Sequence, residues 1–312
     1  MRTMNLYTNN SLSMARTSMS PAVLAKLANS WSLGIRQAVA QNPATSSDTL
    51  IALSRSTHPV IRCAVGKNPF VPLEVLMTLV GDSDRHVRAA AVTYWNGSHD
   101  LLQRLASSDD WRVRVGVAGY PFTSPRILAM LARDNKTPVR AAVAENPGTF
   151  PITLDMLASD RAYSVRRYVA DNESVSFVTL ARLATDRNRF VRRAVGRSEC
   201  TLSETLEALA EDSAKMVRLE VAKNRHSTPN ALALLSRDRS SEIREAVARN
   251  FRTSPTTLHI LAQDKNSKVR AAIVSNACVS PDTLDMLTHD TNSSVRKALK
   301  NKTFGLYVYV HS

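Results

Sequence analysis

The sequence has few aromatic residues and few glycines, and it lacks long apolar segments. Aromatic residues make up 5% of its 312 residues, and the 9 glycines are scattered, so no glycine-rich loop is present to hold a phosphate. No apolar run approaches the length of about 18 residues that indicates a membrane span. The first ten residues lack an apolar h-region, so we expect no secretion signal.

The residues that usually build catalytic and metal sites are also sparse or badly spaced. The three cysteines, Cys63, Cys200 and Cys278, suggest neither a disulfide framework nor a metal cluster, and a reducing cytoplasm is the expected compartment. The seven histidines have no paired spacing typical of metal ligands or a catalytic triad. We therefore predict no catalytic residue, no metal and no cofactor.

What the sequence does contain is a repeat of 26 residues. Eleven arginines stand at this interval, each preceded by valine or isoleucine: Arg36, Arg62, Arg88, Arg114, Arg140, Arg166, Arg192, Arg218, Arg244, Arg270 and Arg296. A period held this strictly predicts a stacked array. Apolar residues three and four positions apart predict short helices. We expect an all-α solenoid of about eleven two-helix repeats, with a core of alanine, valine and leucine.

Each repeat carries signals for the ends of its helices. The first helix often ends at Asn-Pro, as at Asn146-Pro147; asparagine tolerates a left-handed turn, and proline cannot continue a helix. The second helix often begins at Ser/Thr-Pro, as at Ser254-Pro255, where the hydroxyl caps free N–H groups and proline fits the first turn. A Leu-x-x-Leu pair and then an aspartate close the repeat.

The repeat pattern also sets the expected domain boundaries. Residues 1–16 precede it and are expected to form a partly disordered lead or a degenerate cap. Residues 17–303 are expected to form a single helical-repeat domain. Residues 304–312 alternate apolar and polar side chains, and two interpretations stay open: a short strand, or a cap over the last apolar face.

These residues carry a resemblance to a known family. The pattern Val-Arg-x-Ala-Val-Ala-x-Asn-Pro, followed by Leu-x-x-Leu-Ala-x-Asp, resembles the leucine-rich repeat variant, a relative of HEAT-type repeats, over roughly residues 18–302. The resemblance implies a right-handed superhelix in which a longer helix alternates with a shorter, often 3₁₀-like one. Some members carry an iron–sulfur domain held by closely spaced cysteines, which this sequence lacks. The family has no common catalytic site to transfer.

Two charged columns run through the repeats, and we interpret them first as structural. In HEAT-like repeats the aspartate before the turn and the arginine after it form a ladder, and here the two are six positions apart, as in Asp134 and Arg140. A planar guanidinium can bridge a carboxylate and loop carbonyls at once. The expected ladder consists of Asp134, Asp160, Asp186, Asp212, Asp238, Asp264, Arg140, Arg166, Arg192, Arg218, Arg244 and Arg270.

The ladder does not account for the net charge of +14. The loop between the aspartate and the Val-Arg pair carries ten cations against four acids across the repeats. The exposed side of the first helix adds further cations. Stacking turns these columns into a basic edge, which we predict to be a nucleic-acid-binding surface made of Arg161, Arg187, Arg189, Arg193, Arg197, Lys215, Lys223, Arg239, Arg249, Lys265 and Lys268.

A second irregularity is aromatic. Tyr94 and Tyr120 replace the usual asparagine in adjacent repeats, and Trp95 and Trp111 lie nearby in the sequence. Clustered aromatic side chains suit a protein-binding or stacking surface. The alternative is simple repacking around a degenerate repeat.

The leading hypothesis from the sequence is a non-catalytic scaffold whose basic edge binds an acidic macromolecule, nucleic acid before others. Two alternatives stay open: an adaptor that binds a protein through the aromatic region, and a HEAT-like DNA glycosylase, which is disfavoured because structural roles explain most carboxylates. Basic residues that merely keep the chain dissolved would also fit the composition.

Overall fold

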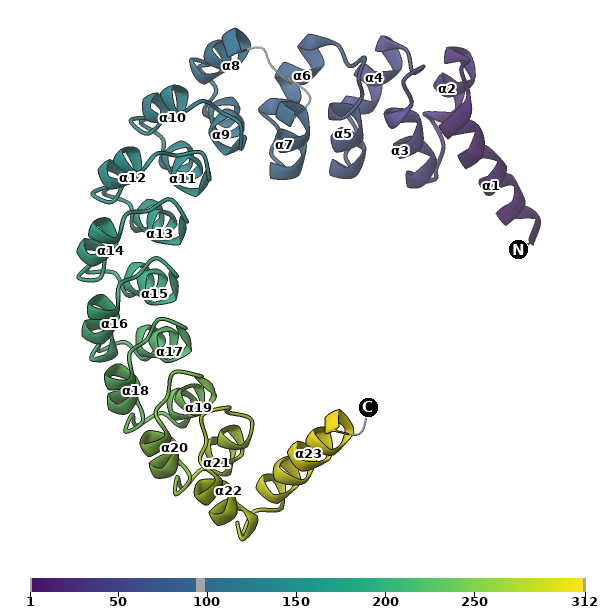
Figure 1. Cartoon of the computed structure of the whole chain (residues 1–312). Coiled ribbons are helices and arrows are strands. Elements are labelled where there is room, and N and C mark those ends of the chain that lie inside the picture. Colours follow the sequence, from purple (N-terminus) through teal and green to yellow (C-terminus); the bar gives the residue numbers. More distant parts are fainter. Residues whose placement is uncertain (1, 94–98, 311–312) are drawn as a thin grey trace. The chain divides into compact units, whose positions relative to one another are not determined.

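The described part of the chain is built mostly from short helices. The computed structural model describes the backbone of residues 2–93 and 99–310, and the side chains of residues 10–91 and 102–301. This part of the chain is all-helical, as predicted, without a strand (Figure 1). It divides into two compact units, unit 1 (Met1–Thr149) and unit 2 (Phe150–Ser312). The single domain 17–303 remains a prediction.

In unit 1 the helices alternate between first and second positions of the repeat. The first helices are α1 (Arg2–Thr17), α3 (Leu33–Gln41), α5 (Pro59–Gly66), α7 (Arg85–Thr93), α9 (Trp111–Gly119) and α11 (Thr137–Glu145). The second helices are α2 (Pro21–Leu27), α4 (Ser47–Ser54), α6 (Leu73–Val80), α8 (His99–Ala106) and α10 (Pro125–Leu131).

Unit 2 continues the same alternation, and Figure 1 shows its first helices side by side in one layer and its second helices in another. The second helices are α12 (Pro151–Leu157), α14 (Phe177–Leu183), α16 (Ser203–Ala210), α18 (Pro229–Leu235), α20 (Pro255–Leu261) and α22 (Pro281–Thr288). The first helices are α13 (Tyr163–Asp171), α15 (Arg189–Arg197), α17 (Lys215–Lys223), α19 (Ser241–Arg249), α21 (Ser267–Val274) and α23 (Ser293–Val310).

The predicted start signals work as expected at several second helices. At α20 the hydroxyl of Ser254 accepts from the N–H of Thr257, and Pro255 occupies the first turn. The 3₁₀ option for the second helices was wrong: all of those in the described residues are α-helices, such as α20, with 7 residues.

Within each unit the core consists of small and medium apolar side chains, one set per repeat. In α19 the side chains of Ile243 and Val247 are completely buried, and in α20 Leu258 and Leu261 are at most 2% exposed. Ala248 on α19 is also fully buried. Small residues at such positions let adjacent first helices pack closely, at the usual interaxial distance of about 8–10 Å.

The asparagine that ends the first helix does not adopt the left-handed conformation that we predicted from the sequence. Asn250 has φ −71° and ψ 124°, which is extended backbone. Its side-chain Nδ2 instead donates to the carbonyls of Ala222 and Asn224 in the preceding repeat, both at 2.9 Å, and its Oδ1 accepts from the N–H of Arg252. The asparagine therefore ties one repeat to the one before it.

Both ends of the described chain are helical. Residues 2–17 form α1, and the side chain of Asn42 donates to the carbonyls of Ala15, Arg16 and Ser18, so the end of α1 serves as the first helix of a preceding repeat. At the other end, the strand interpretation of residues 304–312 was wrong, because α23 continues as a helix to Val310.

Candidate functional site

A ladder of arginines and aspartates runs along the turns that join each repeat to the next. In unit 2, Arg244 donates from Nε to Oδ2 of Asp264 at 2.5 Å and from Nη2 to Oδ1 at 3.0 Å. Its third nitrogen, Nη1, donates to the backbone carbonyl of Asp238 at 2.7 Å. One guanidinium thus holds its own turn and the carboxylate of the following turn.

The same contacts recur along unit 2, and they correct the pairing inferred from the sequence. The carboxylate partner of each arginine lies 20 residues later, whereas the aspartate six residues earlier supplies only its backbone carbonyl. The pairs in unit 2 are Arg166–Asp186, Arg192–Asp212, Arg218–Asp238, Arg244–Asp264 and Arg270–Asp290.

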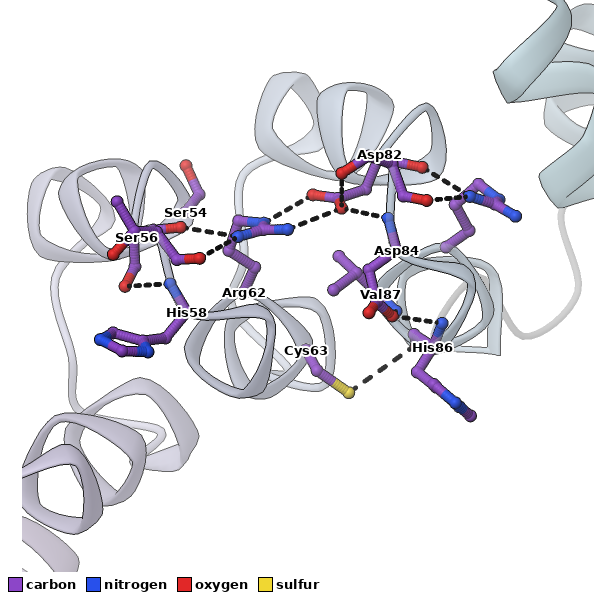
Figure 2. A network of polar contacts seen from close by, with 12 residues as sticks. Ser54, Ser56, His58, Arg62, Cys63, Asp82, Asp84, His86 and Val87 are labelled. Atoms are coloured by element: carbon purple, nitrogen blue, oxygen red, sulfur yellow. Dashed lines mark hydrogen bonds and ion pairs between the residues drawn. The ribbon is translucent and has the colours of Figure 1, made fainter.

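Unit 1 carries the ladder with interruptions. Figure 2 shows Arg62 donating from Nε and Nη2 to both oxygens of Asp82, at 2.7 and 2.9 Å, and from Nη1 to the carbonyl of Ser56. Arg114 pairs with Asp134 in the same way. Opposite Arg36, however, the sequence has Ser56 where most repeats have aspartate, and the buried Nε of Arg36 has no hydrogen-bond partner among the described residues.

Completing the ladder at Arg36 is expected to stabilise the protein. In the Ser56→Asp variant the new carboxylate can accept from the unpartnered Nε of Arg36, with a gain of about 1–2 kcal/mol in the free energy of unfolding. Urea denaturation followed by circular dichroism measures the change. Thr57→Asp, which adds the same charge at the next, exposed position, is the control, and an equal gain in both variants would contradict the explanation.

Arg244 and Asp264 keep their charges throughout the neutral pH range. Burial by itself acts to raise the pKa of the Asp264 carboxyl, but the hydrogen bonds from Arg244 and from the N–H of Asn266 outweigh it, and the pKa lies below its ordinary value. The hydrogen bond to Asp264 raises the pKa of Arg244. Groups with pKa values displaced in these directions do not exchange protons near neutrality, so the geometry assigns them to structure.

The turns that the ladder holds together carry a column of exposed cations in unit 2. Each of these residues directly follows a ladder aspartate, and they are Arg161, Arg187, Arg239 and Lys265. Since Arg166 binds the carbonyls of Asp160 and Arg161 and the carboxylate of Asp186, it fixes the turn of Arg161 beside the turn of Arg187. Among the described residues, no acid lies within ion-pair distance of these four side chains.

Four other residues of the predicted basic surface are already paired with acids. Arg193 lies 2.6 Å from Glu220, Arg197 lies 2.6 Å from Asp171, and the ammonium of Lys215 lies 2.6 Å from Glu242. Arg249 pairs with Glu245 on its own helix. Acids therefore neutralise these four cations. The columns of cations in the sequence did not reveal this pairing.

Two of the three remaining predicted cations extend the exposed column. Arg189 begins α15, Lys268 lies in the first turn of α21, and Lys223 ends α17, all exposed. Lys223 lines a shallow pocket with Leu219 and Glu245, on the exposed side of the first helices. Arg189 and Lys268 lie at the turn side. We call Arg161, Arg187, Arg189, Arg239, Lys265 and Lys268 the basic turn edge.

The predicted aromatic surface lies only in part within the described residues. Tyr94 and Trp95 lie outside the described residues. Tyr120 is 6% exposed, and its ring packs edge-to-face on Phe122, so its side chain is unavailable to a partner. Trp111, at the start of α9, has the guanidinium of Arg112 5.2 Å from the centroid of its ring.

The sequence reasoning missed a different aromatic pair. The rings of Tyr163 on α13 and Phe190 on α15 have centroids 6.3 Å apart, and both are partly exposed, beside the basic turn edge. The two residues lie 27 positions apart, one more than the repeat. The period therefore predicts that they are neighbours in space. Because they occupy different positions of the repeat, comparing the same position in successive repeats does not reveal the pair.

Comparisons with known proteins give the fold. No protein-family model matches the chain, and no curated protein sequence is significantly similar to it. The chain is similar to the solved structure of a leucine-rich repeat variant with a novel repetitive structural motif, with 25% identity and a TM-score of 0.55, over 71% of this chain and 87% of that one. The resemblance seen in the sequence is thus confirmed in the structure.

Two more distant likenesses are to an engineered protein and to importin beta. The engineered protein has 17% identity and a TM-score of 0.36, over 93% of this chain and 96% of its own. Importin beta has 12% identity and a TM-score of 0.41, over 89% of this chain and 49% of its own. Likenesses at this level carry no argument about function.

The described residues show neither a metal-binding cluster nor a membrane-spanning helix. They contain no group of three or more histidine, cysteine, aspartate or glutamate side chains placed to hold a metal ion. Within the same residues, every helix is too short or too polar to span a membrane.

Proposed function

We propose that this chain is a non-catalytic helical scaffold whose basic turn edge binds the phosphate backbone of nucleic acid. The observation that supports this function is the imbalance of charge in the turns of unit 2. Between each ladder aspartate and the following Val-Arg pair, unit 2 has seven cations and one acid, Glu242, which is paired with Lys215. The equivalent turns of unit 1 have three of each sign: Arg85, Arg112 and Lys136 against Asp84, Asp109 and Asp110.

The spacing of the cations suits a linear polyanion. Adjacent first helices pack about 8–10 Å apart, and this distance is similar to the Debye length of about 10 Å at 0.1 M salt. The fields of cations on adjacent turns therefore reinforce one another instead of being screened separately. An extended chain of phosphates running along the turns would meet a cation at most repeats and would release counterions at each contact.

The ladder explains why these cations are available. Five arginines in unit 2, whose side chains are at most 16% exposed, use their donors on aspartates and carbonyls, so the acids on the turns are neutralised internally. The exposed cations next to them have no such partner. Phosphate is a suitable ligand for exposed guanidinium groups, which bind it with two parallel hydrogen bonds. Contacts of this kind position a nucleic acid without reading its sequence.

The proposal is tested by removing two cations from the edge and comparing the salt dependence of binding. For Arg187→Ala/Arg239→Ala we expect weaker binding of a labelled mixed-sequence oligonucleotide and a slope of log affinity against log salt that is shallower by about 2. Fluorescence anisotropy between about 50 and 200 mM salt measures both.

A matched control variant is Arg225→Ala/Arg252→Ala. It removes the same charge from exposed arginines of unit 2 that follow the first helices, at the other turn of the repeat. We expect it to keep the wild-type slope. An equal loss of affinity in both variants would show that only the net charge matters. An affinity of the wild type that does not change with salt would contradict phosphate binding.

A further inference from the structure

Two half-open aromatic rings lie beside the basic turn edge. Tyr163 is the first residue of α13 and is 48% exposed, and Phe190 is the second residue of α15 and is 38% exposed. Their planes are tilted by 31°. Aromatic side chains provide a large contact area, so a pair of them left partly exposed on adjacent repeats has area available for a ligand.

Unpaired cations surround the two rings. The guanidinium of Arg189 lies 5.3 Å from the centroid of Phe190. Arg161 lies two residues before Tyr163, and Arg187 three residues before Phe190. All three arginines are exposed, and the described residues place no acid within ion-pair distance of them. The surface thus combines π-faces with positive charge, within one to three residues of each other along two adjacent turns.

The ladder holds this surface rigidly. Arg166 donates to the carbonyl of Arg161 at 3.2 Å and to both carboxylate oxygens of Asp186 at 2.6 and 2.9 Å. It therefore fixes the turn before Tyr163 against the turn before Phe190. Because the two rings are attached to turns that are already joined, a ligand that stacks on them loses little free energy in ordering the protein.

This chemistry matches a ligand in which flat rings alternate with phosphates. In a duplex the faces of the bases are covered by their neighbours, whereas a single strand offers them to aromatic side chains. An acidic protein could pair with the arginines through its carboxylates, but it does not regularly carry a flat ring next to each negative charge. We propose that unit 2 binds single-stranded nucleic acid, with bases stacked on Tyr163 and Phe190 and phosphates held by Arg161, Arg187 and Arg189; this inference rests on the proposed function.

The test compares three probes of one sequence: a single-stranded oligonucleotide, the same strand with abasic sites, and its duplex. The abasic strand keeps every phosphate and loses bases. At equal salt we expect the wild-type protein to bind the intact strand roughly tenfold or more tightly than the abasic strand, as base stacking on aromatic side chains usually contributes. We expect tighter binding to the intact strand than to the duplex as well.

Two variants assign the effect to the rings. Tyr163→Leu and Phe190→Leu keep apolar bulk and remove the π-face. Each is expected to weaken binding of the intact strand roughly fivefold or more, with the salt slope and the binding of the abasic strand unchanged. Phe251→Leu is the matched control, because Phe251 is also exposed, at 58%, but follows the first helix α19 at the other turn of the repeat.

The outcomes separate this inference from the function on which it rests. If the intact and abasic strands bind equally, with a steep salt dependence, stacking is overturned and phosphate binding survives. If Tyr163→Leu or Phe190→Leu changes the salt slope, the rings act by placing the arginines, and stacking is again overturned. If none of the three probes binds, the proposed function fails and this inference fails with it.

Discussion

Replacing Arg244 with alanine is expected to lower the local stability of unit 2 by about 3–5 kcal/mol, because it leaves a buried carboxylate without its cation. The side chains of Arg244 and Asp264 are 8% and 6% exposed. After the substitution, the Asp264 carboxylate keeps the N–H of Asn266 and loses both bonds from the guanidinium. Native-state hydrogen exchange of the amides of α19 and α21 measures the loss locally, which avoids treating a repeat array as two-state.

Two comparisons test the physical reason for this prediction. Arg225→Ala breaks the Arg225–Glu199 pair, whose side chains are 57% and 65% exposed, and it is expected to cost less than about 1 kcal/mol. Arg244→Met/Asp264→Leu removes both members of the buried pair and should recover much of the stability, since no charge remains unpaired. A similar cost for the Arg225 and Arg244 variants would show that burial of the ladder is not the source of its effect.

The second large effect is expected from Asn250→Ala, at about 3 kcal/mol. The substitution removes three hydrogen bonds of a side chain that is 7% exposed. It leaves the carbonyls of Ala222 and Asn224 and the N–H of Arg252 without this partner. Leaving one buried polar group unsatisfied typically costs about 1–3 kcal/mol. The same hydrogen-exchange measurement, applied to the end of α17 and the start of α20, detects loosening between the two repeats.

The control for this prediction is Asn230→Ala, an exposed asparagine on α18, which should change stability by less than about 0.5 kcal/mol. Asn250→Asp is a further comparison. It keeps the shape of the side chain and exchanges the donating amide for an oxygen facing two carbonyls. It should therefore destabilise at least as much as alanine at neutral pH. Full stability in Asn250→Asp would contradict the role of the amide as donor.

Much of the architecture could be predicted from the repeat alone. The recurrence of Arg at 26 residues, with Val or Ile before it, indicates equivalent positions in successive repeats, and the apolar spacing indicates helices. The Asp–Arg ladder was expected from the resemblance to HEAT-type repeats. Its pairing was not, because a period places residues 6 and 20 positions apart in equivalent columns, and only coordinates show which carboxylate the guanidinium reaches.

At the candidate site, too, the sequence did not show which side chains are exposed or paired. Arg193 and Arg197 belong to the basic columns in the sequence, but Glu220 and Asp171 of other repeats neutralise them. Tyr120 was a candidate for a protein-binding surface, and it is buried. Exposure and pairing depend on the direction of each side chain, which a column of letters does not specify. The proposed stacking role of Tyr163 and Phe190 likewise depends on exposure that only the structure shows.

The sequence by itself determined that this protein is a helical solenoid. It also indicated where the repeats begin and end and which side chains form the core. The physical reason is that a strict period combined with apolar spacing leaves few ways to bury those residues. Only the tertiary structure decided which arginine binds which aspartate, that the asparagines join adjacent repeats, and that unpaired cations and two open rings meet on the turns of unit 2. These features arise between residues of different repeats, and the choice among equally spaced partners is made by side-chain geometry.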